Sequence, residues 1–192
     1  MAQVEPEIYY VAPTPTSPNS VFPLLVYRNV LKHTAPEDIL DTIEPNGWKK
    51  GGQWTTYKIP HYHTTVHETY GIIRGSSTYS MGKTDFDPEF NEQGQENGLK
   101  LHVSVGDVFV VPAGVSHCSL DSEGDYEFIG LYSPEDKQFD MNMGKAPPER
   151  TKILAEKCEN LPIPDSDPIY GKSGPLPRIW KKAKVDAKSI TT

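Results

Sequence analysis

The chain has 192 residues with a formal net charge of −7, 23% charged residues and 36% hydrophobic residues, which predicts one soluble domain with a buried core. Its Lys and Arg residues are scattered, and this argues against a nucleic-acid partner because phosphate binding requires clustered basic side chains. No apolar run approaches the roughly 20 residues that cross a bilayer, and residues 1–7 lack a signal-peptide pattern. We therefore expect a cytoplasmic protein with no membrane partner.

The composition changes along the chain and predicts an arm, a domain and a tail. Residues 1–20 are rich in Pro, Ser and Thr and are expected to form an N-terminal arm that is ordered only where it packs. Residues 21–180 contain no internal repeat and are expected to form a single domain. The basic residues 181–192 are expected to form a solvated C-terminal tail. Cys118 and Cys158 make no disulfide framework and are expected to be reduced.

Two helices are predicted at the periphery, near residues 35–44 and 147–159. The first begins at a capping-box sequence and ends before Pro45. Between the helices, several short strands at close spacing predict a barrel or a sandwich. These strands are expected over residues 54–59, 69–73, 77–81, 99–103, 107–111 and 126–132. A Pro-rich extended segment, 161–177, is expected before the tail.

Two separate segments carry the residues that can bind a metal. His61 and His63 are two positions apart, so on an extended strand both imidazoles project to the same side. Glu68 adds a carboxylate from the next strand, and His117, just past a Pro-x-Gly turn, adds a third imidazole. These four groups suit one divalent transition metal, Fe, Mn, Ni or Zn, with positions left open for substrate or water. The alternative is a set of hydrogen-bonded polar residues in an empty or sugar-binding barrel.

Alternation along the strands gives candidates for the pocket wall on the same side as His61 and Glu68. They are Tyr57, Ile59, Tyr70, Ile72 and Arg74. Tyr57 and Tyr70 can hydrogen-bond a substrate, and Glu68 is a candidate general base if it leaves the metal. His67 is expected on the side opposite Glu68, as a hydrogen-bonded or dimer-surface residue. On the strand over 126–132, either alternating face could line the cavity.

The spacing of the two segments resembles the two signature motifs of the cupin superfamily. The first reads His61-x-His63, four residues, Glu68, six residues, Gly75, and the second reads Gly106, five residues, Pro112-x-Gly114, two residues, His117. Thr55 and Asp121 stand where these motifs often carry Gly and Asn, and neither is a ligand position. The run 61–68, the turn 112–117 and the tail 167–176 look like the small YjlB-like cupins.

This resemblance covers residues 45–180 and implies an all-β fold. The expected architecture is a cupin-type antiparallel β-barrel (double-stranded β-helix, or jelly roll) with a few short peripheral helices. Cupins commonly dimerise by exchanging N-terminal strands, so the resemblance also implies a homodimer.

The four candidate ligands predict a metal-dependent enzyme that acts on a small oxygen-rich organic molecule. Lewis-acid isomerase, lyase or decarboxylase chemistry and Fe-dependent dioxygenation are both compatible with them. A non-catalytic cupin that binds a small ligand or a metal is the alternative. An open pocket with converging polar groups favours the enzyme, whereas a closed cavity favours the binding protein. A third possibility is a sugar-nucleotide epimerase-like cupin, which relies on a His and Tyr acid–base pair instead of a metal.

Overall fold

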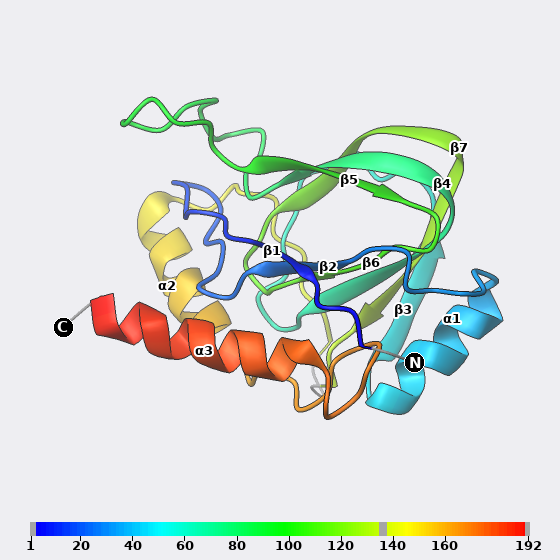
Figure 1. Cartoon of the computed structure of the whole chain (residues 1–192). Coiled ribbons are helices and arrows are strands. Elements are labelled where there is room, and N and C mark those ends of the chain that lie inside the picture. Colours follow the sequence, from blue (N-terminus) through cyan, green and yellow to red (C-terminus); the bar gives the residue numbers. More distant parts are fainter. Residues whose placement is uncertain (1–2, 135–137, 191–192) are drawn as a thin grey trace.

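The computed structural model describes residues 3–134 and 138–190. Within these ranges, seven strands form one antiparallel sheet that curls into a barrel, with helices around it (Figure 1). The strands are β1 (Glu7–Tyr9), β2 (Leu24–Tyr27), β3 (Lys49–Trp54), β4 (Glu68–Met81), β5 (Leu99–Ser104), β6 (Val108–Val111) and β7 (His117–Tyr132). The helices are α1 (Pro36–Ile43), the 3₁₀ helix η1 (Glu44–Asn46), α2 (Pro148–Glu159) and α3 (Pro175–Ile190). The prediction of an all-β antiparallel barrel with peripheral helices is confirmed.

The long strands β4 and β7 form the spine of the barrel. The strand order is β1-β2-β6-β4-β7-β3, and β5 also pairs with β4. The first part of β4 pairs with β6 and the last part with β5, so β4 belongs to both halves of the sheet. Register shifts between Ile72 and Ser76 interrupt its pairing with β7, and such bulges bend a strand. Figure 1 shows β4 and β7 arching together around the barrel.

Alternating side chains on the strands pack into two separate apolar cores. On β6, Val108 and Val110 belong to one cluster, whereas Phe109 and Val111 belong to the other. The outer cluster also contains residues from two helices, namely Ile39, Ile43, Leu176, Ile179 and Trp180. The inner cluster is rich in aromatic rings, namely Tyr70, Tyr79, Phe109, Tyr126 and Phe128. Helices α1 and α3 therefore cover the outside of the sheet, and the interior of the barrel is aromatic.

The segment expected as a solvated tail over residues 181–192 is helical in the part that the structure describes, because residues 181–190 continue helix α3, and most of its side chains are exposed. Pro175 and Pro177 lie in the first turn of this helix, where a missing backbone N–H breaks no helical hydrogen bond. They therefore begin the helix instead of extending the chain. The buried face of α3 follows helical spacing and consists of Leu176, Ile179, Trp180 and Ala183.

The predicted strand over residues 54–59 is also wrong, since the strand at this point is β3, Lys49–Trp54. The sequence did not predict β3 because Gly51 and Gly52 lie in it, and glycine has a low strand propensity. A Cβ at Gly51 would lie 2.3 Å from the ring of Tyr132, and one at Gly52 would lie 2.4 Å from the ring of Trp54. The predicted strands over 69–73 and 77–81 are two parts of the single strand β4.

The N-terminal arm packs on its own chain. Strand β1 pairs with β2, and the backbone N–H of buried Asn19 donates to the carbonyl of Gly114 at 2.9 Å. The arm thus contacts the turn that precedes His117, and the expected homodimer stays a prediction. Among the described residues, none of the helices has the length and apolar content needed to cross a membrane.

The docking of α3 can be tested at Trp180, whose ring stacks on Phe22 at 5.0 Å and whose Nε1–H donates to the carbonyl of Pro23. Trp180→Ala is expected to lower the free energy of unfolding by about 3–5 kcal/mol, measured by urea denaturation, because it opens a cavity in the outer core. Val185→Ala, at a 63% exposed position of the same helix, is the control and should change it by less than about 0.5 kcal/mol. Equal effects of both substitutions would contradict this packing.

Candidate metal centre

Backbone hydrogen bonds bring the two motif segments together at one end of the barrel. The N–H of His117 donates to the carbonyl of His61 at 2.9 Å, and the N–H of His61 donates back at 3.3 Å. The N–H of Gly114 donates to the carbonyl of His63 at 2.7 Å. The turn before His117 is therefore fixed against the strand-like segment that carries the other two histidines.

The three histidines form a buried cluster that could hold a metal ion. His61, His63 and His117 are 6%, 4% and 1% exposed, and one ligand atom from each lies within 4.8 Å of the others. Two nitrogens that each bind one ion at about 2.1 Å lie at most about 4.2 Å apart, so small side-chain rotations suffice for chelation. The structure thus unites the three predicted imidazole ligands.

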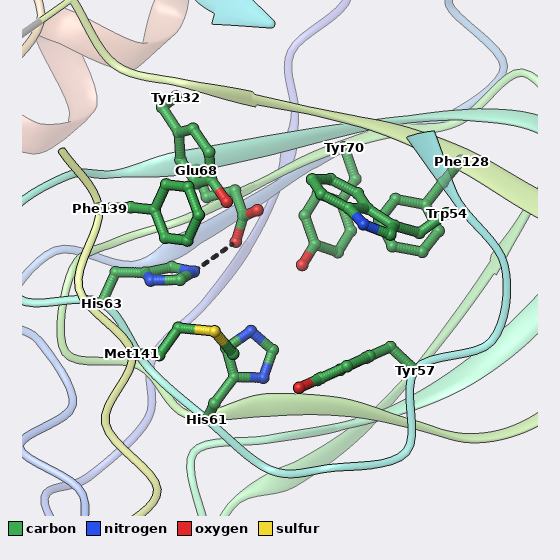
Figure 2. A pocket seen from close by; sticks show the side chains of 10 residues that line it. All are labelled: Trp54, Tyr57, His61, His63, Glu68, Tyr70, Phe128, Tyr132, Phe139 and Met141. Atoms are coloured by element: carbon green, nitrogen blue, oxygen red, sulfur yellow. Dashed lines mark ion pairs between the residues drawn. The ribbon is translucent and has the colours of Figure 1, made fainter. Parts of the chain in front are cut away.

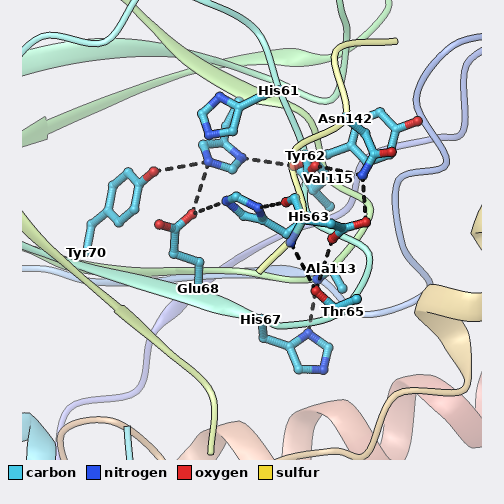
Figure 3. A network of polar contacts seen from close by, with 12 residues as sticks. His61, Tyr62, His63, Thr65, His67, Glu68, Tyr70, Ala113, Val115 and Asn142 are labelled. Atoms are coloured by element: carbon cyan, nitrogen blue, oxygen red, sulfur yellow. Dashed lines mark hydrogen bonds and ion pairs between the residues drawn. The ribbon is translucent and has the colours of Figure 1, made fainter. Parts of the chain in front are cut away.

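Each of the three imidazoles is oriented by a backbone carbonyl, and Figure 3 shows the surrounding network of polar contacts. Nδ1 of His61 contacts the carbonyl of Ile59 at 2.9 Å, and Nδ1 of His117 contacts that of Val115 at 3.0 Å. Nδ1 of His63 contacts the carbonyl of Asp140. Because a carbonyl can only accept, each Nδ1 carries the proton, and in the neutral rings each Nε2 is left with a lone pair.

Glu68 completes the cluster from the first residue of β4. Its Oε2 lies 3.2 Å from Nε2 of His117 and 3.4 Å from Nε2 of His63. Oε2 of Glu68 and Nε2 of His63 are both buried, and neither has a hydrogen-bond partner among the residues that the structure describes. While the rings are neutral, a carboxylate oxygen and imidazole lone pairs thus face one another, an arrangement that is unfavourable unless a proton on His63 or a metal cation lies between them.

Burial and mutual charge set the protonation of these groups in opposite directions. Burial and the neighbouring His117 lower the pKa of His61 to about 3, so this imidazole is neutral. Burial also acts to lower the pKa of His63, but the charge of Glu68 outweighs it and the pKa is raised. Burial acts to raise the pKa of Glu68, but His63 holds it well below its usual range. The carboxylate is therefore ionised and attracts positive charge to this point.

Tyr70 is the polar neighbour of the cluster on the side of the barrel interior. Its hydroxyl lies 3.1 Å from Nε2 of His117, to which it can donate. Burial and the negative charge of Glu68 raise the pKa of Tyr70 well above its usual value. The phenol therefore keeps its proton and acts as a hydrogen-bond donor.

A cavity of about 210 Å³ opens beside the cluster (Figure 2). It is lined by Trp54, Tyr57, His61, His63, Glu68, Tyr70, Phe128, Tyr132, Phe139 and Met141. Tyr70 lies in the wall on β4, as alternation along the strand predicted. Tyr57 also lies in the wall, but it comes from a segment that is not a strand, and on β7 the aromatic face turns inward.

Two of the expected wall residues lie elsewhere. Arg74 is exposed and pairs with Glu127 at 2.7 Å, because the bulge after Ile72 breaks the alternation of β4. Ile59 is 49% exposed, because its segment is not a regular strand. Ile72 points inward but packs in the inner core and does not line the cavity.

A strap over residues 138–142 forms the wall that sequence reasoning missed. Phe139 stacks on Tyr132 with ring centroids 4.8 Å apart. Between Phe139 and Met141, the carboxylate of Asp140 accepts hydrogen bonds from the N–H of Thr64 and from the side chains of Thr64, Thr65 and Asn142. The strap is thereby tied to the His63 segment. No strand or helix signal marks it, so the sequence offered no means of placing it.

His67 lies outside the metal cluster. It is fully buried, and its Nδ1 accepts a hydrogen bond from the N–H of Ala113 at 3.0 Å. Its ring packs on Trp180 at 4.7 Å. His67 therefore supports the turn before His117 from the outer side, as Figure 3 shows for its contact with Ala113.

The antiparallel barrel has the fold of a cupin. Its two sequence motifs meet at a buried histidine cluster, which is where cupins place their metal ligands. The chain is 33% identical over 161 residues to the uncharacterized protein YjlB of Bacillus subtilis (strain 168), across 84% of this chain and 87% of that protein. The chain therefore belongs to the YjlB family of cupins. A comparison with models of protein families found no match.

Solved structures show lower similarity. An uncharacterized conserved protein with a double-stranded β-helix domain from Klebsiella pneumoniae is 14% identical, over 74% of this chain and 84% of that one, with a TM-score of 0.33. Procruciferin, an 11S globulin from Brassica napus, is 14% identical over 48% of this chain and 21% of its own, with a TM-score of 0.35. An oxalate decarboxylase is 15% identical over 57% of this chain and 24% of its own, with a TM-score of 0.28.

The strap can be tested at Asp140, whose backbone carbonyl orients His63 and whose carboxylate holds the strap in place. Asp140→Ala is expected to weaken Zn(II) binding about tenfold, because partners that orient a ligand typically contribute this much. A competing chelator measures the affinity, and circular dichroism verifies the fold. Asp41→Ala, at an exposed position of α1, is the matched control and should leave the affinity unchanged. Equal affinities in both variants would show that the strap does not orient His63.

Proposed function

We propose that this protein is a metal-dependent enzyme that acts on a small oxygen-rich organic molecule. His61, His63, Glu68 and His117 would hold one divalent transition metal, Fe, Mn, Ni or Zn. The observation that carries this proposal is the pair of buried, unpartnered atoms, Oε2 of Glu68 and Nε2 of His63, within 3.4 Å of each other. One cation would satisfy both of them together with the other two imidazoles.

The cavity beside the cluster supports a catalytic role over storage of a metal. Its wall includes residues at the surface, since Trp54, Phe139 and Met141 are 38%, 46% and 44% exposed. A small molecule can therefore enter and place an oxygen near the cluster. A pocket that combines apolar walls with a few converging polar groups is the usual form of a small-molecule site.

A bound divalent ion would act as a Lewis acid toward a hydroxyl, carbonyl or carboxylate oxygen, and iron would additionally allow chemistry with O₂. Within this site, the protonated phenol of Tyr70 would donate a hydrogen bond to an oxygen of the substrate. Glu68, ionised and adjacent, would accept a proton if it leaves the ion. Tyr57, whose ring contacts that of His61 edge-on at 5.0 Å, would position the substrate from the opposite wall.

A second candidate is supported by the contact between Tyr70 and His117. A phenol and an imidazole 3.1 Å apart could work as an acid–base pair without a metal, as in epimerase-like cupins. This hypothesis gives no role to His61, and it requires a proton on His63 to pair Nε2 of His63 with Oε2 of Glu68. The metal-dependent enzyme is therefore the better supported proposal.

Substitution of His63 tests the metal assignment. His63→Ala is expected to lose most of the metal that copurifies with the protein, because it removes one of three imidazole ligands. The melting temperature of the metal-free protein should stay within a few degrees, since the apolar clusters supply the core. Metal is measured by elemental analysis after purification without chelators.

The matched control is His102→Ala, which changes an exposed histidine on β5. It should retain the full metal content. Equal metal content in the two variants would refute the assignment of His63 as a ligand. Iron in the unsubstituted protein would favour dioxygenation, whereas zinc, nickel or manganese would favour redox-neutral chemistry.

A further inference from the structure

We propose that the cavity takes a planar aromatic molecule with a single anionic oxygen group, such as an aromatic monocarboxylate, whose ring lies against the outer wall of the pocket. This inference rests on the metal centre proposed above and names the substrate class for it. Four features of the cavity support this inference. They are its aromatic wall, the glycines that leave space for the aromatic rings, its net charge, and its volume and exposed mouth.

The wall beyond the metal cluster is aromatic. Trp54, Tyr57, Phe128, Tyr132 and Phe139 line it together with Met141, whose thioether also packs well on rings. Figure 2 shows Trp54 and Phe128 on one side of Glu68 and Tyr132 and Phe139 on the other. Flat rings on two sides favour a flat ligand, because aromatic pairs gain energy in stacked or edge-on contact.

Three glycines let these rings occupy their positions. A Cβ at Gly51 would collide with the ring of Tyr132, and one at Gly52 would collide with Trp54. At Gly130, a Cβ would lie 2.8 Å from the Trp54 ring and 3.3 Å from Oε1 of Glu68. Gly130 therefore lies between the Trp54 ring and the Glu68 carboxylate, and a larger residue there would occupy the space that separates them.

The charge of the cavity limits the ligand to one anionic group. Glu68 is the one acidic side chain among the described residues that line the cavity, so its carboxylate and a divalent cation would together bring the net charge to +1. One carboxylate or phenolate group at the cluster would neutralise this net charge of +1. Among the residues that the structure describes, the ten that line the cavity include no Lys or Arg, so a second anionic group within the cavity would have no cationic partner there. Dicarboxylates and phosphate esters therefore fit poorly.

The volume of the cavity and the exposure of its mouth fit a ligand of one or two rings. The volume, about 210 Å³, is below the roughly 300 Å³ at which pockets for drug-sized ligands begin. Trp54, Phe139 and Met141 expose apolar surface at this mouth. Clustered exposed apolar groups of this kind mark binding surfaces, and a bound ring would cover them.

Calorimetric titration of the Zn(II)-loaded protein with four probes tests this inference. Benzoate is expected to bind about tenfold more tightly than acetate, which lacks the ring, and than cyclohexanecarboxylate, which is not planar. It should also bind about tenfold more tightly than terephthalate, which adds a second carboxylate to the same ring. Equal affinity for benzoate and acetate would overturn the aromatic class, and tight binding of terephthalate would overturn the limit of one charge.

Substitution of Trp54 tests whether the aromatic wall of the cavity causes the preference for benzoate. Trp54→Ala should reduce benzoate affinity about tenfold and leave acetate affinity unchanged, and Trp54→Phe should restore most of the loss. Phe90→Ala, at a 50% exposed aromatic position away from the cavity lining, is the matched control and should change neither. An unchanged benzoate affinity in Trp54→Ala would contradict the proposal.

The two proposals fail in different ways. The zinc content of each sample is measured beside the titration. Protein that holds zinc through His63 but does not prefer benzoate contradicts the substrate class alone. Protein that holds no zinc contradicts the metal centre, and in that case the ratio of benzoate to acetate affinity on the metal-free protein still decides the role of the aromatic wall.

Discussion

The candidate metal centre depends on one electrostatic constraint at the end of the barrel. The Nδ1 atoms of His61, His63 and His117 are directed at backbone carbonyls, so their Nε2 lone pairs are left for the centre of the site. Glu68 brings an ionised carboxylate to the same place. Buried acceptors that face one another are stable only with a positive charge between them, whether a proton on His63 or a metal ion. The proposed function follows from this need.

The rest of the fold holds these groups in place. Strand β4 begins at Glu68 and pairs with β6 and β7, so the carboxylate is fixed by a strand that belongs to both halves of the barrel. His67 supports the turn before His117 from the outer core, and the strap tied by Asp140 orients His63 from the surface. The cluster is thus held by the strand pairing of β4, by His67 and by Asp140, and of these supports His67 and Asp140 are not themselves ligands, which is how proteins fix the geometry of metal sites.

The ligand cluster was predictable from sequence because its signals are local. Two histidines at alternate positions of an extended segment share a face, and a Pro-x-Gly turn sets the position of His117. Three other features were not predictable, for identifiable reasons. The prolines that begin α3 are also typical of extended chain. Strand β3 was not predicted because it contains Gly51 and Gly52. These glycines leave space for the rings of Tyr132 and Trp54, and this requirement is known only from the three-dimensional structure. The strap with Phe139 and Met141 is held by side-chain hydrogen bonds that leave no periodic pattern in the sequence.

The coordination of a bound ion is the most direct test of the central claim. X-ray absorption spectroscopy of the Zn(II)-loaded protein reports the nearest atoms around the metal. Our account predicts three imidazole nitrogens at about 2.0–2.1 Å together with at least one carboxylate oxygen. A spectrum with fewer than three imidazoles, or with thiolate sulfur at about 2.3 Å, would contradict it.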